Sequence, residues 1–231
     1  MFEKRSRQKE YLDESEIPNA ALLQNLEELD VINRYLGGYA ITLNALKCTL
    51  KPNKRYVLVD IGCGGGDSLQ QIDKWARKNN HLISLYGVDI KPICIGYAKA
   101  KNQNSNIEFI CDDYRNCNKH IHTIDIIHAS LFCHHLTEEE IIELIQFANK
   151  NSIILVINDL ERNPIAYYAI KFLTTILSKS YLVKNDAPLS VLRGFKKKEW
   201  EELIRKAGVQ NYTVKHKWAF RHAVTIYPNN L

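Results

Sequence analysis

The residues best suited to bind a ligand form one continuous block, Val57–Asp67, in which an apolar run meets a cluster of glycines. The first half of the block is apolar and rich in β-branched residues, which predicts a short strand buried on both faces. The glycines that follow can adopt positive φ and let a ligand approach the main chain closely. Asp67 then begins an amphipathic segment, 69–78, with the pattern of a helix. A strand, a glycine turn and a helix N-terminus together form the usual nucleotide site of a doubly wound sheet.

Spacing and charge in this loop distinguish between classes of nucleotide. The loop has the pattern G-x-G-x-G from Gly62 to Gly66, and Asp67 stands where the dinucleotide fingerprint requires its third glycine. Asp60 and Asp67 flank the loop with carboxylates, which would repel a pyrophosphate and attract an ammonium or sulfonium group. The loop therefore favours S-adenosylmethionine (SAM), which has no phosphate and carries positive charge, over NAD or FAD. A glycine-rich turn without a ligand is the alternative.

The nine residues Val59–Asp67, Val-Asp-Ile-Gly-Cys-Gly-Gly-Gly-Asp, resemble the first motif of class I SAM-dependent methyltransferases. The resemblance covers roughly residues 55–228 and implies that SAM binds at the ends of the first four strands. Asp60 and Gly62 would meet its methionine end. The implied cofactor residues are Asp60, Gly62, Cys63, Gly64, Asp67, Asp89, Ile90, Asp112, Asp113, Ser130 and Leu131.

The same resemblance implies roles for the acidic residues that end the next two strands. Asp89 would accept hydrogen bonds from the ribose diol, as acidic residues do in dinucleotide folds. Asp112, or else Asp113, would contact the adenine amino group, with Ile90 beside the ring. The alternatives are that Asp89 caps the helix that begins near Pro92, and that the aspartate pair lies in a solvated turn.

The block Ser130–Leu136, Ser-Leu-Phe-Cys-His-His-Leu, leaves the fourth strand and resembles the small-molecule branch, which includes ubiquinone and menaquinone C-methyltransferases. It lacks the Asn/Asp-Pro-Pro-aromatic motif of DNA amino-methyltransferases, so nucleic acid is not the expected acceptor. Methyl transfer needs alignment and, for oxygen acceptors, removal of a proton. His134 and His135 are the candidate bases, because histidine titrates near neutral pH. Packing or helix-terminal roles are the alternative.

Asp159 and Arg162 follow the fifth strand and are the other candidate catalytic residues. Arg162 would hold an anionic or carbonyl group of the acceptor; a salt bridge with a neighbouring carboxylate is the alternative. The segment 165–177 is almost wholly apolar, which predicts either a core helix or a lid over a pocket. The segments 189–195 and 220–221 also resemble acceptor-side segments of methyltransferases from polyketide or aromatic-lipid pathways.

The elements that must position these residues alternate from residue 56 onward. Strands followed by helices predict right-handed crossovers and a doubly wound, mostly parallel α/β sheet. Five such units and a terminal hairpin resemble the seven-stranded methyltransferase sheet with its antiparallel C-terminal hairpin. The strands are expected at 57–61, 82–89, 107–111, 122–129, 152–158, 209–216 and 218–227, and a capping box predicts a helix from 137 to 149.

Two helices are expected before the first strand. Apolar residues recur at helical spacing from Leu22 to Ile32, and a second such pattern covers 39–50. We expect residues 1–50 to form a helical cap, with residues 1 to about 18 loosely structured, and 51–231 to form the methyltransferase domain with a helical insert at about 160–195. Within that insert, the segment 182–195 has an irregular composition.

Composition sets the remaining limits. The chain has 231 residues, which is enough for one α/β core. Its formal charge of +5 is too mild to demand an acidic partner. Six cysteines without a C-x-x-C pair indicate reduced thiols in the cytoplasm. No apolar run approaches a membrane span. The run Lys196–Lys198 is expected to be solvated, and His120-x-His122 has no third ligand nearby, so we expect no metal site.

The sequence therefore predicts an enzyme that transfers a methyl group from SAM to a small, mostly apolar acceptor. A phenolic, quinol-like or polyketide-derived metabolite is expected, and the protein would be a monomer or homodimer. An RNA or protein methyltransferase, or a catalytically silent SAM-binding domain, is the alternative.

Overall fold

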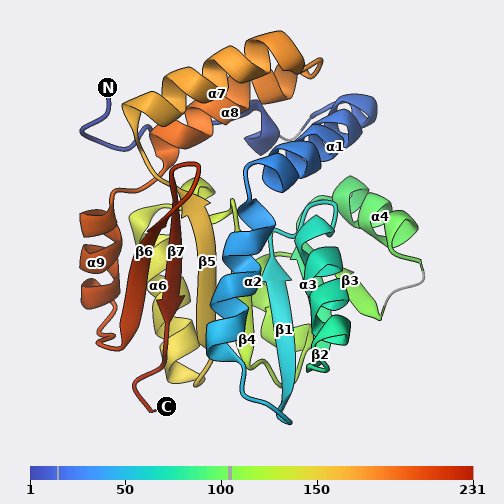
Figure 1. Cartoon of the computed structure of the whole chain (residues 1–231), viewed down its shortest axis with the longest axis vertical. Helices are drawn as coiled ribbons and strands as arrows, with labels where there is room; N and C mark the ends of the chain where they lie inside the picture. Colours follow the sequence, from blue (N-terminus) through green and yellow to red (C-terminus); the bar gives the residue numbers. More distant parts are fainter. Residues whose placement is uncertain (15, 104–105, 231) are drawn as a thin grey trace.

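A computed structural model of the chain describes residues 1–14, 16–103 and 106–230. Its centre is a seven-stranded sheet in the order β3-β2-β1-β4-β5-β7-β6 (Figure 1). The first five strands pair in parallel, whereas β7 is antiparallel to both β5 and β6. The doubly wound sheet with an antiparallel C-terminal hairpin is thus confirmed. The strands are β1 (Arg55–Ile61), β2 (Leu82–Asp89), β3 (Ile107–Cys111), β4 (Ile126–Ser130), β5 (Ile154–Leu160), β6 (Tyr212–Lys217) and β7 (Arg221–Ile226).

Helices cover both faces of the sheet because its central strands are apolar on both sides. One core packs α2 (Gly38–Thr49), α3 (Asp67–Lys78) and α4 (Pro92–Lys101) against the sheet. The other packs α5 (Cys117–His120), α6 (Glu138–Lys150) and α9 (Lys197–Lys206) against the opposite face. The predicted capping box starts α6: the Thr137 hydroxyl accepts from the Glu140 amide at 3.2 Å, and the Thr137 amide donates to the Glu140 carboxylate at 2.9 Å.

A helical layer lies over the carboxyl ends of the parallel strands. It consists of α1 (Asn19–Tyr35), α7 (Pro164–Leu177) and α8 (Tyr181–Arg193), which Figure 1 shows together above the sheet with the N-terminal segment. A carboxylate ties this layer together: Glu28 of α1 accepts a hydrogen bond from the Ser178 hydroxyl and from the amides of Lys179 and Ser180, at 3.1 and 3.0 Å. The helix α7 is not a core helix, since much of its apolar surface is exposed: Ile165, Tyr168, Phe172, Ile176 and Leu177.

One sequence prediction for this layer was wrong, and one helix was not singled out. The segment 182–195, whose composition is irregular, is mostly α8, which contains Pro188 and has only a weak apolar periodicity because it is buried on several sides. Residues 1–14 are not loosely structured. The side chain of Arg5 donates to the carbonyl of Arg193 at 2.9 Å, and the Tyr11 and Leu12 amides both donate to the Asp186 carboxylate at 2.9 Å. Such backbone contacts leave no periodic signal in a sequence.

Across the described residues, no helix combines the length and the apolar composition that crossing a bilayer requires. The fourth strand begins four residues later than predicted, at Ile126. The hairpin strands β6 and β7 are each shorter than predicted, since residues 218–220 form the turn between them.

Candidate active site

The carboxyl ends of β1, β2, β3 and β4 surround a cavity of about 340 Å³. This is where ligands bind in doubly wound sheets. All eleven predicted cofactor residues line it: Asp60, Gly62, Cys63, Gly64, Asp67, Asp89, Ile90, Asp112, Asp113, Ser130 and Leu131. The structure therefore brings together side chains and amides from four separate strand ends, as the motif predicted.

The glycine loop is held open toward this cavity by Asp89. The two oxygens of its carboxylate accept from the amides of Gly64 and Lys91, each at 2.9 Å. Burial raises the pKa of Asp89 despite these hydrogen bonds. The side chain thus joins the glycine loop to the residue that precedes α4. Gly62 has a φ of +64°, and a Cβ there would lie 2.2 Å from the Phe132 ring, so only glycine fits.

A buried chain of polar side chains lies behind the loop. Oδ1 of Asp60 lies 2.6 Å from Nδ1 of His128 on β4, and Nε2 of His128 lies 3.0 Å from the Thr42 hydroxyl of α2. Thr42 also accepts from the amide of Asn158 at 3.3 Å. This network fixes the Asp60 carboxylate, which is 2% exposed, at the edge of the cavity.

The aspartate pair after β3 is engaged locally. Asp112 accepts from the Asn116 amide at 2.9 Å and contacts His120 at 2.6 Å, and these contacts lower the pKa of Asp112 to about 2. Asp113 forms two hydrogen bonds with the Arg115 guanidinium, which lower its pKa. Both carboxylates are therefore charged at neutral pH, and both border the cavity.

The charge of the cavity is strongly negative. Its described lining residues include seven aspartates and a single lysine, Lys91. The aspartates are Asp13, Asp30, Asp60, Asp67, Asp89, Asp112 and Asp113. Lys101 partly compensates Asp67, at 2.6 Å. Such a lining fits a cationic ligand without phosphate, in agreement with the argument from the loop sequence.

A second cavity, of about 300 Å³, adjoins the first and is mostly apolar. Its walls come from α1, α7, α8, the N-terminal segment and the turn between β6 and β7. Four residues line both cavities: Leu12, Leu29, Leu131 and His135. Leu131 has a positive φ of +52°, and its amide donates to the Asn158 carbonyl at 2.9 Å. A strained conformation of this kind is characteristic of functional sites.

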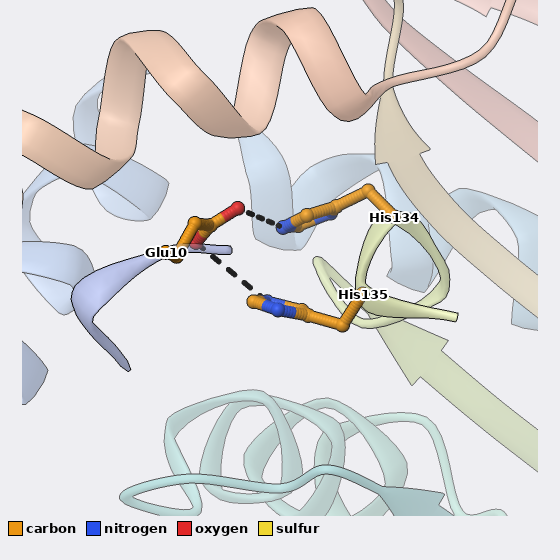
Figure 2. Close-up of side chains that lie close together, drawn as sticks. All are labelled: Glu10, His134 and His135. Atoms are coloured by element: carbon orange, nitrogen blue, oxygen red, sulfur yellow. Dashed lines mark ion pairs between the residues drawn. The ribbon is translucent and has the colours of Figure 1, made fainter. Parts of the chain in front are cut away.

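The two predicted histidines lie where the cavities meet, on the 3₁₀ turn η3 (Cys133–His135). Nδ1 of His134 lies 2.7 Å from Asp159, whose other oxygen accepts from the His134 amide at 3.0 Å. Nδ1 of His135 lies 2.8 Å from Asp13. Both rings turn their Nε2 atoms toward the Glu10 carboxylate, at 3.7 and 3.9 Å, as Figure 2 shows.

Burial and neighbouring charges shift the pKa values of the carboxylates in this cluster. Glu10 is 2% exposed, and desolvation raises its pKa to about 7 against the opposing effect of His135 and Arg193. Asp159 is fully buried; desolvation alone would raise its pKa, but His134 and the backbone amides outweigh it and the pKa lies below its usual value. Asp159 lies behind His134 and, among the described contacts, does not line either cavity.

Arg162 does not line either of these two cavities. Its guanidinium donates to the carbonyls of Phe2, Glu3 and Gly194, and it pairs with Glu199 at 2.5 Å. It therefore joins the N-terminal segment to the sheet and α9, which corrects the expectation that it faces the acceptor. Its salt bridge is formed with Glu199 of a distant helix, and not with Glu161 or Asp159, which were the alternative partners.

Several residues of the site were missed by sequence reasoning. Glu10 and Asp13 come from the segment that was expected to be loose, and no local pattern marks them. Arg221 is 2% exposed and lines the apolar cavity; Nη2 donates to Asn33 at 2.8 Å, while Nε and Nη1 have no partner among the described residues. The loose resemblance at 220–221 was the one signal that pointed to it.

Comparisons with known proteins agree with this geometry. Residues 58–150 match a family described as methyltransferase domain. A comparison with curated protein sequences gives no match. Among solved structures, the plantazolicin methyltransferase BpumL, in complex with a monoazolic desmethylPZN analog and SAH, superposes with a TM-score of 0.66 at 19% identity, over 91% of this chain and 90% of that one.

Two further structures share the fold. Human N-acetylserotonin methyltransferase in complex with SAM gives a TM-score of 0.64 at 16% identity, over 91% of this chain and 56% of that chain. A putative O-methyltransferase from Nostoc punctiforme gives a TM-score of 0.56 at 14% identity, over 90% of this chain and 65% of that chain. The likeness shows the fold, and the family match at 58–150 shows the kind of domain. Residues 58–150 are therefore a methyltransferase domain, and the chain has the fold of methyltransferases whose structures contain SAM or SAH.

Proposed function

We propose that the protein transfers a methyl group from SAM to a small, mostly apolar acceptor with an aromatic ring, such as a phenol, a quinol or a polyketide-derived metabolite. The observation that carries the proposal is the apolar cavity that adjoins the acidic one through Leu131 and His135. SAM supplies an electrophilic methyl group on a sulfonium. The acidic cavity matches its positive charge, and the apolar cavity offers no comparable complement to a phosphate backbone.

The acceptor cavity suits an aromatic or aliphatic ring system. Its walls are mostly leucine, isoleucine, valine and alanine side chains from three helices. Two of the proteins with this fold are described as methyltransferases of plantazolicin, with azolic analogs bound, and of N-acetylserotonin. Both names denote compounds with aromatic rings. This supports a ring-bearing acceptor without identifying it.

The imidazole at the junction is the proposed proton acceptor. His135 lines both cavities, and Asp13 binds its Nδ1 so that Nε2 faces the interior. His134 is held in the same way by Asp159. An imidazole positioned by a carboxylate in this manner is a competent general base, because the carboxylate fixes the tautomer and stabilises the imidazolium.

Arg221 replaces Arg162 as the proposed contact for a polar group of the acceptor. It is a buried cation in the wall of an otherwise apolar cavity, and burial lowers its pKa to about 10, so it stays charged at neutral pH. Two of its nitrogens have no partner in the described part of the chain. A carbonyl or carboxylate oxygen on the acceptor would satisfy them.

Transfer of a labelled methyl group from SAM provides the test. The protein is incubated with tritiated SAM and separate pools of phenols, quinols, acyl-carrier-bound polyketides and bulk RNA. Transfer to one of the three small-molecule pools, with weaker turnover in Arg221→Met at unchanged SAM affinity, supports the proposal. Label on RNA alone would refute it. We also infer a reducing, cytoplasmic location, which the six free cysteines support.

A further inference from the structure

Three potential metal ligands converge at the floor of the acceptor cavity. They are a carboxylate oxygen of Glu10 and the Nε2 atoms of His134 and His135, which Figure 2 shows facing one another. The ligand atoms of these three residues all lie within 4.8 Å of one another. Two of the residues are buried and the third is half-buried. They come from the N-terminal segment and from η3, so only the folded chain brings them together.

Both histidines have the supporting contacts that metal-binding histidines show. Nδ1 of His134 is bound by Asp159 at 2.7 Å, and Nδ1 of His135 by Asp13 at 2.8 Å. Because an ionised carboxylate can only accept, the proton is assigned to each Nδ1, and in the neutral ring Nε2 then keeps its lone pair. Carboxylate–histidine pairs of this kind fix the ring and raise its basicity toward a metal ion.

One oxygen of the Glu10 carboxylate lacks a hydrogen bond although the side chain is buried. Its Oε1 has no hydrogen-bond partner among the described residues, and the separations of 3.7 and 3.9 Å to the imidazoles are too long for hydrogen bonds. A buried carboxylate oxygen without a hydrogen bond is costly. A cation between the three groups would satisfy it.

The local charge also favours a cation. Three carboxylates contact the two imidazoles: Glu10, Asp13 and Asp159. Among the described residues, Arg193 is the one guanidinium within ion-pair distance of these carboxylates, at 3.6 Å from Glu10. Arg193 is itself held by Asp13 at 2.5 Å and by the carbonyls of both histidines. Carboxylates thus outnumber guanidiniums in ion-pair contact within the cluster, which favours a bound cation.

We propose that Glu10, His134 and His135 bind a divalent cation of the borderline class, such as Zn²⁺ or Co²⁺, with its open side toward the acceptor cavity. Two imidazoles and one carboxylate are a donor set that such ions accept. All three residues line the acceptor cavity. The sequence predicted no metal site because Glu10 lies more than a hundred residues from the two histidines.

If the proposed function holds, the ion would lie where an acceptor hydroxyl must lose its proton. A coordinated oxygen loses its proton at lower pH than a free one. The ion and the proton compete for the same Nε2 atoms, so the cluster acts either as a base or as a Lewis acid, and not as both at once. Binding of the ion itself requires no acceptor.

Titration with Co²⁺ tests the site directly, in the full-length protein without acceptor, by the visible absorption of the bound ion and by calorimetry. One equivalent with tetrahedral or five-coordinate absorption, displaced by Zn²⁺, is expected. Glu10→Gln and His134→Gln should abolish that absorption. Asp159→Asn should weaken binding about 10- to 100-fold, as expected for a residue that orients a ligand.

The control is His216→Gln, in a second histidine–glutamate group formed by Glu161, His216 and His222 at the sheet edge. It should leave the Co²⁺ signal unchanged. SAM affinity, measured on every variant, reports whether the fold is retained. Absence of the absorption in the wild type, its persistence in folded Glu10→Gln, or its loss in His216→Gln would each overturn the proposal. None of these outcomes depends on whether the acceptor of the proposed function is correct.

Discussion

The two adjoining cavities are built in different ways. The cofactor cavity is formed by loops at the ends of parallel strands, and it is lined by seven aspartates and by backbone amides. The acceptor cavity is formed by side chains of α1, α7 and α8, and it is mostly apolar apart from a few buried polar groups. The volumes are similar, about 340 and 300 Å³, so chemistry and not size separates them.

Under the proposed function, this difference divides binding between the two cavities. Recognition of a fixed, charged cofactor uses hydrogen-bonding groups held by the sheet, where each position is defined by a strand end. Recognition of the acceptor uses apolar area on three helices, which lie over the sheet and can change without disturbing it. The chemistry is proposed for His135, which lines both cavities, and for the nearby Glu10.

The largest expected effect is on chemistry at the junction. His135→Gln or His134→Gln should reduce methyl transfer about 10²- to 10⁴-fold, the usual contribution of a positioned base. SAM affinity should be unchanged, and the acidic limb of the pH–rate profile should flatten. His81→Gln, which alters a ring stacked on Trp75, is the control. If both junction variants keep the full rate, the histidines are structural.

Next in size is an effect on stability from a residue that serves neither cavity. Arg162→Ala leaves three backbone carbonyls and Glu199 without their buried cation. Loss of one partner of a buried ion pair costs about 3–5 kcal/mol. The midpoint of urea unfolding should fall accordingly, while calorimetry on the folded variant shows unchanged SAM affinity. Arg77→Ala, in an exposed pair, should cost less than about 1 kcal/mol. A stable Arg162→Ala with poor acceptor turnover would restore the substrate-binding role.

A smaller effect is expected in the cofactor cavity. Asp89→Ala removes an acceptor that would bind the ribose and that also holds the Gly64 amide. Hydrogen bonds to a charged group contribute about 1.5–3 kcal/mol. SAM should therefore bind about 10- to 100-fold more weakly by calorimetry. Asp73→Ala on the surface of α3 should leave the SAM affinity unchanged. An unchanged SAM affinity in Asp89→Ala would remove the ribose-binding assignment of Asp89.

The smallest effect concerns the helices over the acceptor cavity. Burial opposes ionisation of Glu28, but hydrogen bonds from Ser178, Lys179 and Ser180 outweigh it and lower its pKa. Because the pKa of Glu28 is lower in the folded state, its ionisation stabilises the fold at pH values above the unfolded-state pKa, near 4.5. That stabilisation is lost as the pH falls through the folded-state pKa. Hydrogen exchange of the 179–180 amides, corrected for its intrinsic pH dependence, should therefore accelerate below about pH 4. In Glu28→Gln the exchange should already be faster at pH 7. Equal protection in both proteins would contradict this.

Sequence reasoning predicted the cofactor half of the site well because its signals are local. The glycine loop, Asp89 and the aspartates after β3 each follow a strand within a few residues, and parallel strands bring their carboxyl ends to one edge. The seven-stranded sheet was expected from the same alternation and from the methyltransferase resemblance, and the structure gives the order of its strands. The direct roles of these residues toward SAM remain predictions.

The acceptor half could not be predicted because its contacts join distant segments. Arg162 follows β5, as an acceptor residue would, but Glu199 and the carbonyls of Phe2 and Glu3 bind its guanidinium instead. The helix α8 escaped prediction since burial on several sides removes the amphipathic pattern on which prediction relies.

The sequence by itself determined the class of fold, the glycine loop with its acidic flanks, and the strand ends that surround the cofactor cavity. All of these depend on periodicity and turn chemistry over short stretches. Only the tertiary structure brought Glu10 to His134 and His135, and only it directed Arg221, in place of Arg162, to the acceptor cavity. The physical reason is that a buried polar group takes whichever partner the packed chain offers, and that partner can lie at any separation along the sequence.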